Sequence, residues 1–453
     1  MIIFAVVLLL GGVVFLMYQG ILPGIKRGNP VTGGPVGPAP INLTMWNVFE
    51  DAEIYSELIA DYKALYPHIT INYSKIDYAE YRDRLNQAFI EGKAPDIYPI
   101  HNTWLPLEQK RIAPAPGTLA AVAGFEEIFP PVVRFDFTRE LEGGAREVYA
   151  LPLAIETLGL FYNKDYFAAA NIVSSPKTWE EALDYVKLFT QYDDTGNIKL
   201  SGIALGAGNN INRAADIAML LMLQGGARMN NELLTQATFN EQVWVGEGEK
   251  QKRFSPGKDA LDFYLAFSDK TKPVYAWDKS MPYSIDAFVE GKTAILVNYP
   301  HQIPVIVSKA PHVNFATGSM LQFKDRAADT NYASYWGFTV AKGSLQKEAA
   351  WQFIDFMLEP ENLKKYLEAA KLPTARRDLI LWQQQDALLR PFVNQILSAK
   401  SWYQGDSLAA EKILLDMLTS AEVGEQTVEE ALEDAAARIT VFIQKTIQEN
   451  NSE

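Results

Sequence analysis

Apolar and polar residues along the chain recur in two periods, which predict strands followed by helices. Residues 41–46 alternate between apolar and polar, as a half-buried strand does. Residues 54–65 carry apolar side chains at helical spacing, 69–73 read as a second strand, 78–89 as a helix and 94–100 as a third strand. This order predicts a mostly parallel sheet with helices on both faces and a ligand site beyond the carboxyl ends of its strands.

A second pattern surrounds Glu156. Residues 158–162 are continuously apolar or aromatic, which is typical of a strand buried on both faces. Thr178 and Glu181 then form a Thr-x-x-Glu capping box that begins a helix. Glu156 itself stands just before the buried strand, where a lone carboxylate is costly unless something bonds it. A ligand would satisfy it, and so would a neighbouring Lys or Arg.

The carboxyl-terminal part is predicted to be helical. Residues 346–358 place apolar side chains on one side, and Pro360 opens the next helix. Thr427 and Glu430 form another capping box, which is followed by apolar residues at helical spacing. We interpret both apolar stripes as core or inter-lobe packing.

Composition narrows the function. The chain has 453 residues, a net charge of −14 and no cysteine. The acidic net charge disfavours nucleic acid as a partner, and the absence of cysteine excludes disulfides and thiol chemistry. We find no Ser-His-Asp, metal-ligand or phosphate-loop pattern and expect neither a cofactor nor catalysis. A glycoside hydrolase with Glu156 as one of two carboxylates is the enzyme alternative. Residues 192–197 superficially suggest a calcium loop, but a hairpin or connecting turn is the favoured interpretation.

The amino terminus predicts a membrane anchor. Residues 2–17 contain no charge, and the apolar character continues to residue 22, which is near the minimum length for a span. No convincing cleavage site follows, so we expect 1–27 to be a retained signal anchor and the Gly/Pro-rich residues 28–40 to be a linker. Lys26 and Arg27 oppose the positive-inside rule. We nevertheless expect a single-pass protein of the cell membrane with its folded body outside the cytoplasm.

Six motifs carry a resemblance to a known family. They are, in chain order, MWNVFED, YKALYPHITINY, EGKAPDIYPI, FVEGKTAILVNYP, YWGFTVAKGSLQKEAAWQFIDFML and GEQTVEEALEDAAARIT. Together with YALPLAIETLGLFYNKDYF, they resemble the extracellular solute-binding proteins of sugar-importing ABC transporters. The resemblance covers roughly residues 41–447.

The resemblance implies an α/β, two-lobed, periplasmic-binding-protein type II fold whose chain crosses between the lobes three times. The crossings are expected near 153–157, 335–338 and 372–376. The expected lobes are 41–154 plus 337–372 for the amino-terminal lobe and 155–336 plus 373–450 for the carboxyl-terminal lobe. The lobes of such a fold close over a ligand by hinge motion.

The function that the resemblance implies is the capture of a sugar or oligosaccharide and its delivery to the permease subunits of an ABC importer. We expect a monomer. The same fold could instead bind a polyamine, an amino acid or a peptide, and acidic side chains clustered around the aromatic ones would favour a polyamine. A surface glycan sensor that feeds no transporter is a further alternative.

Ten residues are expected to bind the ligand, because aromatic faces stack on sugar rings while amides, carboxylates and imidazoles bond hydroxyls. Some follow the first and third predicted strands, and others follow from the resemblance, which places His301 where the family has a sugar-stacking Trp. Their alternative roles are structural, such as helix capping, a hydrogen-bonded histidine or hinge packing by Trp336. The ten are Asn47, Glu50, His101, Asn102, Trp104, Glu156, Tyr299, His301, Trp336 and Trp402.

Overall fold

A computed structural model of the protein describes residues 38–117, 122–141, 143–245, 252–324, 326 and 328–451. The chain divides into two units, Met1–Ile41 and Asn42–Glu453, and the second contains the folded body. The predicted anchor, 1–27, and most of the predicted linker lie outside the described residues. Within the part that is described, none of the helices combines the length and the apolar character needed to cross a bilayer.

The first lobe is built around a five-stranded sheet with the strand order β2-β1-β3-β16-β4. Strand β1 (Ile41–Asn47) is parallel to β3 (Ile97–His101), but β16 (Trp336–Ala341) is antiparallel to β3 and to β4 (Ile112–Ala113). The prediction of a mostly parallel sheet is therefore only partly right here. Local strand–helix order could not indicate β16, because that strand returns from the other lobe and enters the sheet in the opposite direction.

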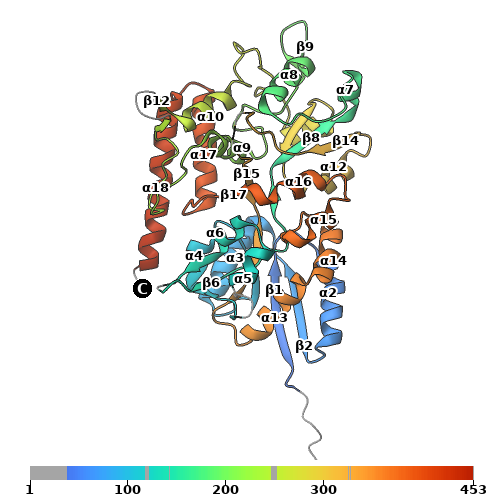
Figure 1. Cartoon of the computed structure of the whole chain (residues 1–453), viewed down its shortest axis with the longest axis vertical. Coiled ribbons are helices and arrows are strands. Elements are labelled where there is room, and N and C mark those ends of the chain that lie inside the picture. Colours follow the sequence, from blue (N-terminus) through green and yellow to red (C-terminus); the bar gives the residue numbers. More distant parts are fainter. Residues whose placement is uncertain are drawn as a thin grey trace, which may run out of the picture. The chain divides into compact units, whose positions relative to one another are not determined.

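Helices from both ends of the sequence pack together in the first lobe. Figure 1 shows α2 (Ala52–Leu65) beside α14 (Pro360–Ala370), and α2 also contacts α13 (Lys347–Leu358). The buried side of α2 includes Tyr55, whereas Leu65 is 64% exposed. The buried face of this helix is thus displaced from the predicted apolar face toward Tyr55, because α13 and α14 pack on the side that carries Tyr55.

The second lobe is centred on β8 (Gly159–Asn163), which pairs antiparallel with β13 (Ile295–Asn298) and with β14 (Phe315–Gly318). Four of its five residues are buried, so the predicted buried strand is confirmed with a shift of one residue. A side chain at Gly159 would meet the ring of Phe392 at 2.5 Å, so this close approach needs glycine. Both pairings of this sheet are antiparallel.

The helix caps follow the sequence prediction closely. Thr427 and Glu430 form the full capping box at the start of the last helix, with the Thr427 backbone N–H donating to the Glu430 carboxylate at 2.9 Å and the Glu430 N–H donating to Oγ1 of Thr427 at 3.3 Å. Thr178 also accepts from the N–H of Glu181, at 3.2 Å. The carboxylate of Glu181, however, accepts from the N–H of Lys177, one residue earlier than a capping box requires.

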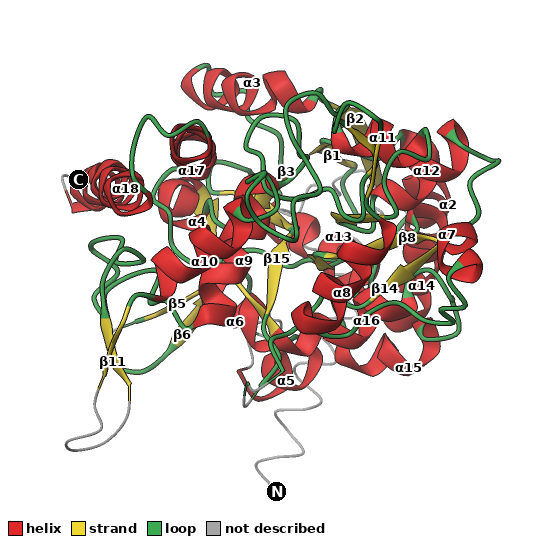
Figure 2. Cartoon of the chain, turned by 90° about the horizontal axis from the view of Figure 1, so that it is seen from above, coloured by secondary structure: helices red, strands yellow, loops and turns green. Residues whose placement is uncertain are grey.

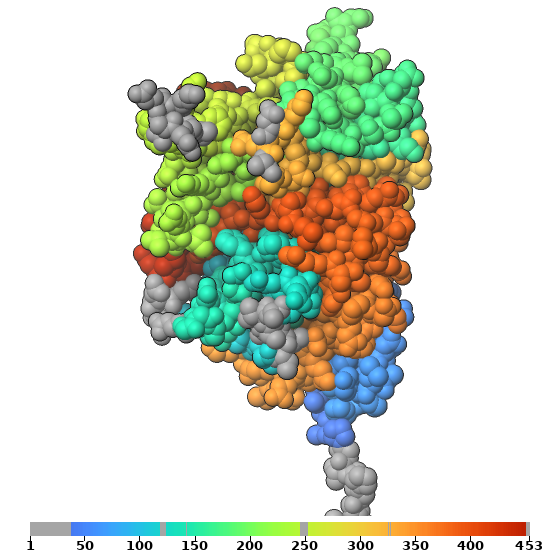
Figure 3. Space-filling view, viewed as in Figure 1, coloured from blue at the N-terminus to red at the C-terminus, as the bar shows by residue number. Residues whose placement is uncertain are grey.

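A small sheet and its neighbours hold the segments that were predicted to cross between the lobes. Its strand order is β17-β15-β7. Beside it, the N–H of Ile155 donates to the carbonyl of Pro373 at 3.1 Å, and the N–H of Ala375 donates to that of Leu153 at 3.2 Å. Residue Tyr335 alone connects β15 to β16. The three predicted crossing segments therefore lie side by side. In Figure 3 the dark orange surface at the place of α15 (Ile380–Gln383) and α16 (Arg390–Gln395) lies between the teal and blue part of the molecule and the green part.

Two long carboxyl-terminal helices, α17 (Ser407–Glu422) and α18 (Val428–Asn451), lie side by side in the second lobe, as Figures 1 and 2 both show.

Residues 192–197 form the predicted hairpin turn between β9 and β10. The described elements not yet given are β2 (Ile69–Lys75), α3 (Tyr78–Ile90), α4 (Leu105–Glu108), α5 (Val122–Ile128), α6 (Pro131–Phe137), β5 (Thr138–Glu140), β6 (Arg146–Val148), β7 (Glu156–Thr157), α7 (Lys164–Ala169), α8 (Trp179–Phe189), β9 (Gln191–Tyr192), β10 (Ile198–Leu200), α9 (Ala214–Gly225), β11 (Val243–Val245), β12 (Lys252–Phe254), α10 (Pro256–Leu265), α11 (Ser284–Val289), α12 (Gln302–Lys309), β15 (Asn331–Ser334) and β17 (Ala399–Lys400).

Candidate functional site

Two adjoining cavities lie where elements of the two lobes meet, and they share the side chains of Phe49 and Trp336. The larger one, which we name the cleft cavity, has a volume of about 190 Å³. The smaller one, the side cavity, has a volume of about 50 Å³. Trp336 begins β16 directly after the connecting residue Tyr335, so a crossing segment itself places the shared indole ring.

The first-lobe wall of the cleft cavity is aromatic. The ring of Trp336 lies edge-on to those of Phe49 and Trp104, with centroids 5.5 and 5.0 Å apart. Tyr78, at the start of α3, contacts the rings of Phe49 and Trp336. Phe49 is 50% exposed and Tyr78 is 49% exposed, so their rings are open to a ligand.

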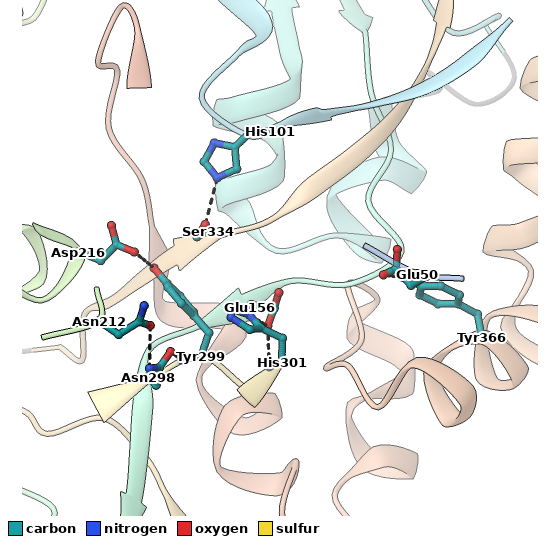
Figure 4. A network of polar contacts seen from close by, with 10 residues as sticks. All are labelled: Glu50, His101, Glu156, Asn212, Asp216, Asn298, Tyr299, His301, Ser334 and Tyr366. Atoms are coloured by element: carbon teal, nitrogen blue, oxygen red, sulfur yellow. Dashed lines mark hydrogen bonds and ion pairs between the residues drawn. The ribbon is translucent and has the colours of Figure 1, made fainter. Parts of the chain in front are cut away.

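His101 lies at the end of β3 within this aromatic wall. Its Nδ1 is 2.8 Å from the hydroxyl of Thr103, and its Nε2 is 3.0 Å from that of Ser334 on β15 (Figure 4). Burial, with a smaller contribution from the nearby charge of Arg213, lowers the pKa of His101 to about 3. The imidazole is therefore neutral at physiological pH and acts in the wall as a hydrogen-bonding group without charge.

The second-lobe wall of the cleft cavity is charged. Arg213 precedes α9, Asp216 lies in its first turn, and Glu411 projects from α17. The guanidinium of Arg213 lies 5.4 Å from the centroid of the Tyr299 ring, whose hydroxyl donates to Asp216 at 2.9 Å (Figure 4). Burial raises the pKa of the Asp216 and Glu411 carboxyls. An acidic, partly desolvated surface thus faces the aromatic rings.

The backbone at Arg213 is unusual. Its φ of +65° is in the left-handed region, which residues other than glycine rarely adopt and which costs about 1–2 kcal/mol. The conformation turns the chain into α9 and sets Arg213 and Asp216 on the same wall. A strained residue beside a cavity is a common property of ligand sites.

The side cavity contains the carboxylate of Glu50. This group accepts from Nδ2 of Asn47 at 2.7 Å and from the hydroxyl of Tyr366 at 2.9 Å. Burial, the largest cause, raises the pKa of Glu50. Glu156 on β7 lines the same cavity, so two carboxylates and an amide share one small space.

Among the residues that the structure describes, neither a Lys nor an Arg bonds Glu156. Its Oε2 accepts from the backbone N–H of His301 at 3.0 Å and lies 2.9 Å from Nδ1 of the same residue (Figure 4). The side chain of Glu156 is 17% exposed and that of His301 is 34% exposed. The contact ties β7 to the loop after β13, which explains how a carboxylate is accommodated before a buried strand.

The structure does not bring all ten predicted residues to the two cavities. His101, Trp104 and Trp336 line the cleft cavity, whereas Asn47, Glu50, Glu156 and again Trp336 line the side cavity. The other four line neither of these cavities. Tyr299 is 1% exposed and His301 bonds Glu156, whereas Asn102, which donates to Asp136, and Trp402, which is 2% exposed, line a separate cavity of about 280 Å³.

The family model described as bacterial extracellular solute-binding protein matches residues 47–364. The chain belongs to this family. As a solute-binding protein it is similar to the maltotriose-binding protein of Pyrococcus abyssi, with 24% identity over 337 residues, which are 71% of this chain. The match spans 64% of that relative, which is less than two thirds of its length.

Solved structures share the fold of this solute-binding protein. The sugar-binding protein of Xanthomonas citri has a TM-score of 0.72 at 19% identity, and the match covers 91% of this chain and all of that one, 100%. The cyclic alpha-maltosyl-1,6-maltose binding protein of Arthrobacter globiformis has a TM-score of 0.70 at 17% identity, and the match covers 90% of this chain and 100% of that one. The two-lobed α/β fold is thereby confirmed, whereas the transmembrane helix stays a prediction.

The cavity-lining residues of this solute-binding protein that sequence reasoning missed include Phe49, Tyr78, Arg213, Asp216 and Glu411. Phe49 stands between two predicted site residues, so its position after the first strand was an available signal. Arg213 and Asp216, three residues apart at a helix start, offered a weaker signal. Glu411 offered none, because its place on the wall depends on how α17 packs against α9.

Proposed function

We propose that this solute-binding protein binds a carbohydrate in the cleft between its lobes and delivers it to an ABC importer. The observation that carries the proposal is the pairing of walls in the cleft cavity. One wall offers the rings of Trp336 and Trp104, and the facing wall offers Arg213, Asp216 and Glu411. A sugar ring has the matching chemistry, with apolar C–H faces and a polar hydroxyl edge.

The proposed roles of the ten predicted residues follow their positions. Those at the cavities contact the ligand: Trp336 and Trp104 stack on a ring, His101 and Asn47 bond hydroxyls, and Glu50 and Glu156 accept from hydroxyls in the side cavity. Those that line neither of the two cavities position the others: Asn102, Tyr299, His301 and Trp402. The maltotriose and maltose derivatives named for the similar proteins support a carbohydrate ligand.

The rest of the proposal concerns the setting of this site. We assign the lobes to 41–154 plus 337–372 and to 155–336 plus 373–450, with closure about the three crossing segments. The protein acts as a monomer, anchored outside the cytoplasm by residues 1–27, and presents its closed form to permease subunits. It binds and releases its ligand without chemical change.

A thermal-shift screen of the purified full-length chain tests the proposal. Monosaccharides, oligosaccharides, amino acids, short peptides and polyamines are each added in large excess. A ligand at a hundred times its dissociation constant adds about 2.7 kcal/mol of stability. We expect at least one carbohydrate to raise the melting temperature. A shift with amino acids, peptides or polyamines alone would show that the ligand class is wrong.

A further inference from the structure

The charged wall of the cleft cavity is incompletely satisfied by the protein itself. Nε of Arg213 is fully enclosed and has no hydrogen-bond partner. Among the described residues, neither the Arg213 guanidinium nor the Glu411 carboxylate makes a hydrogen bond or ion pair, and Asp216 accepts only from Tyr299. Partly buried charges without partners are costly, so these groups are preorganised for a polar ligand.

The charges around the two cavities do not balance. Of the described residues that line them, four carry carboxylates, namely Glu50, Glu156, Asp216 and Glu411, whereas Arg213 is the single basic side chain apart from the neutral His101. The formal charge of the lining is therefore −3. The backbone N–H of His301 donates to Glu156, but no basic residue of the described lining is bonded to Glu411 or to Glu50.

The facing aromatic wall reinforces this negative character. The faces of Trp and Tyr rings carry negative electrostatic potential and attract cations. Burial is the main cause that raises the pKa of the Tyr78 hydroxyl, and the nearby charge of Glu411 raises it further. A cation at this point would thus meet a carboxylate on one side and electron-rich rings, Tyr78 and Trp336, on the other.

We infer that the carbohydrate carries a protonated amine, which Glu411 and Asp216 bind against the rings of Tyr78 and Trp336. This inference rests on the proposed carbohydrate function and narrows it to amino sugars. Arg213 compensates the charge of one of the two carboxylates. The charge of the second carboxylate is then available to the ammonium group of the ligand. A neutral sugar cannot neutralise that charge.

Matched sugar pairs test this inference in the full-length protein. Isothermal titration at about pH 6, where the amine is protonated, compares glucosamine, galactosamine and mannosamine with the parent hexoses and the N-acetyl derivatives. The β-1,4-linked glucosamine dimer and trimer are compared with cellobiose and cellotriose. We expect at least one amine to bind about tenfold or more tightly than its neutral partners, and added salt to weaken that preference.

A pair of conservative variants locates the charge responsible. Glu411→Gln keeps the shape of the side chain but removes its charge, so the ratio of amine affinity to neutral-sugar affinity should fall about tenfold or more. Glu433→Gln, at an exposed position on α18, is the matched control and should leave the preference unchanged. Melting temperature and circular dichroism establish that both variants are folded.

The outcomes separate the two proposals. Equal binding of amines and neutral partners would overturn the amine inference and leave the carbohydrate function standing. Binding of neutral sugars with no amino sugar bound would do the same. If spermidine binds and no sugar does, the carbohydrate function fails together with the inference, and the acidic cleft belongs to a polyamine site.

Discussion

The indole nitrogen of Trp104 donates a hydrogen bond to the hydroxyl of Ser407 at 3.0 Å. Trp104 follows β3 of the first lobe, and Ser407 begins α17 of the second, so this bond joins the two walls of the cleft cavity. It holds the Trp104 ring at the edge of the cavity. It is also a contact between the two lobes that does not involve the ligand.

Removing this hydroxyl should weaken ligand binding. One hydrogen bond contributes about 1 kcal/mol, so Ser407→Ala is expected to raise the dissociation constant of the best carbohydrate from the screen about fivefold. Titration calorimetry measures the effect. Ser56→Ala, which removes a hydroxyl that bonds locally on α2, is the control. An unchanged dissociation constant in a folded Ser407→Ala protein would show that the contact does not favour closure.

Truncating the shared ring should have a larger effect. Trp336 lies in both cavities, and the loss of a stacked aromatic with its buried area is expected to cost about 2 kcal/mol, or about thirtyfold in the dissociation constant. Trp336→Ala is compared by calorimetry with Trp244→Ala, which removes a 60% exposed indole from β11. Similar losses in both variants would contradict a stacking role.

The buried carboxyl of Asp136 should make stability depend on pH. It accepts from Nδ2 of Asn102 at 3.0 Å, from the hydroxyl of Tyr335 at 2.6 Å and from that of Ser401. Burial outweighs these bonds and raises its pKa from 3.8 to about 6. A raised pKa means that the folded state holds the proton more tightly, so its contribution to stability is full below pH 3.8 and is lost as the pH rises to about 6.

We therefore expect wild type to lose about 3 kcal/mol of unfolding free energy between about pH 4 and pH 7 relative to Asp136→Asn, which cannot titrate. Urea unfolding at both pH values measures it, with Asp434→Asn at an exposed position as the control. Parallel pH dependences of wild type and Asp136→Asn would show that the pKa of Asp136 is not raised.

The capping box of α18 gives a prediction that is independent of the ligand. Thr427→Ala removes the acceptor for the Glu430 N–H and should lower the unfolding free energy by about 1 kcal/mol. Thr427→Ser keeps the hydroxyl and should stay within a few tenths of wild type. Denaturant unfolding distinguishes the two, and equal losses in both variants would mean that the methyl group, not the cap, matters.

Features determined by short stretches of sequence were predictable. Strand β8 and the Thr427 cap depend on neighbouring residues, and the crossing at Tyr335 was found through the resemblance. Relations between distant segments were harder. The antiparallel entry of β16 and the packing of α13 and α14 on α2 depend on chain passing through the other lobe, which local periodicity does not reveal.

The candidate site divides in the same way. His101 was predicted because it stands at the carboxyl end of a strand, where parallel-sheet proteins place their ligand sites, and Trp336 because the resemblance places it at a crossing between the lobes. Tyr299 was chosen from its place in the motif of the resemblance, and Trp402 as an aromatic residue in a loop before a late helix. Each is turned inward, where its polar atom finds a partner in the protein. Glu411 could not be chosen, because nothing in its local sequence distinguishes a cleft-facing helix position from a solvent-facing one.

The pairing of the crossing segments restricts how the lobes can move. Leu153 and Ile155 are hydrogen-bonded to residues 373–375, and β7 is paired with β15. The three crossing segments therefore bend together as one hydrogen-bonded unit. A twist of one lobe against the other would break these hydrogen bonds, whereas a hinge bend of the whole hydrogen-bonded unit leaves them intact. The ligand-free protein therefore has few relative orientations of its lobes, and closure around a ligand costs little conformational entropy.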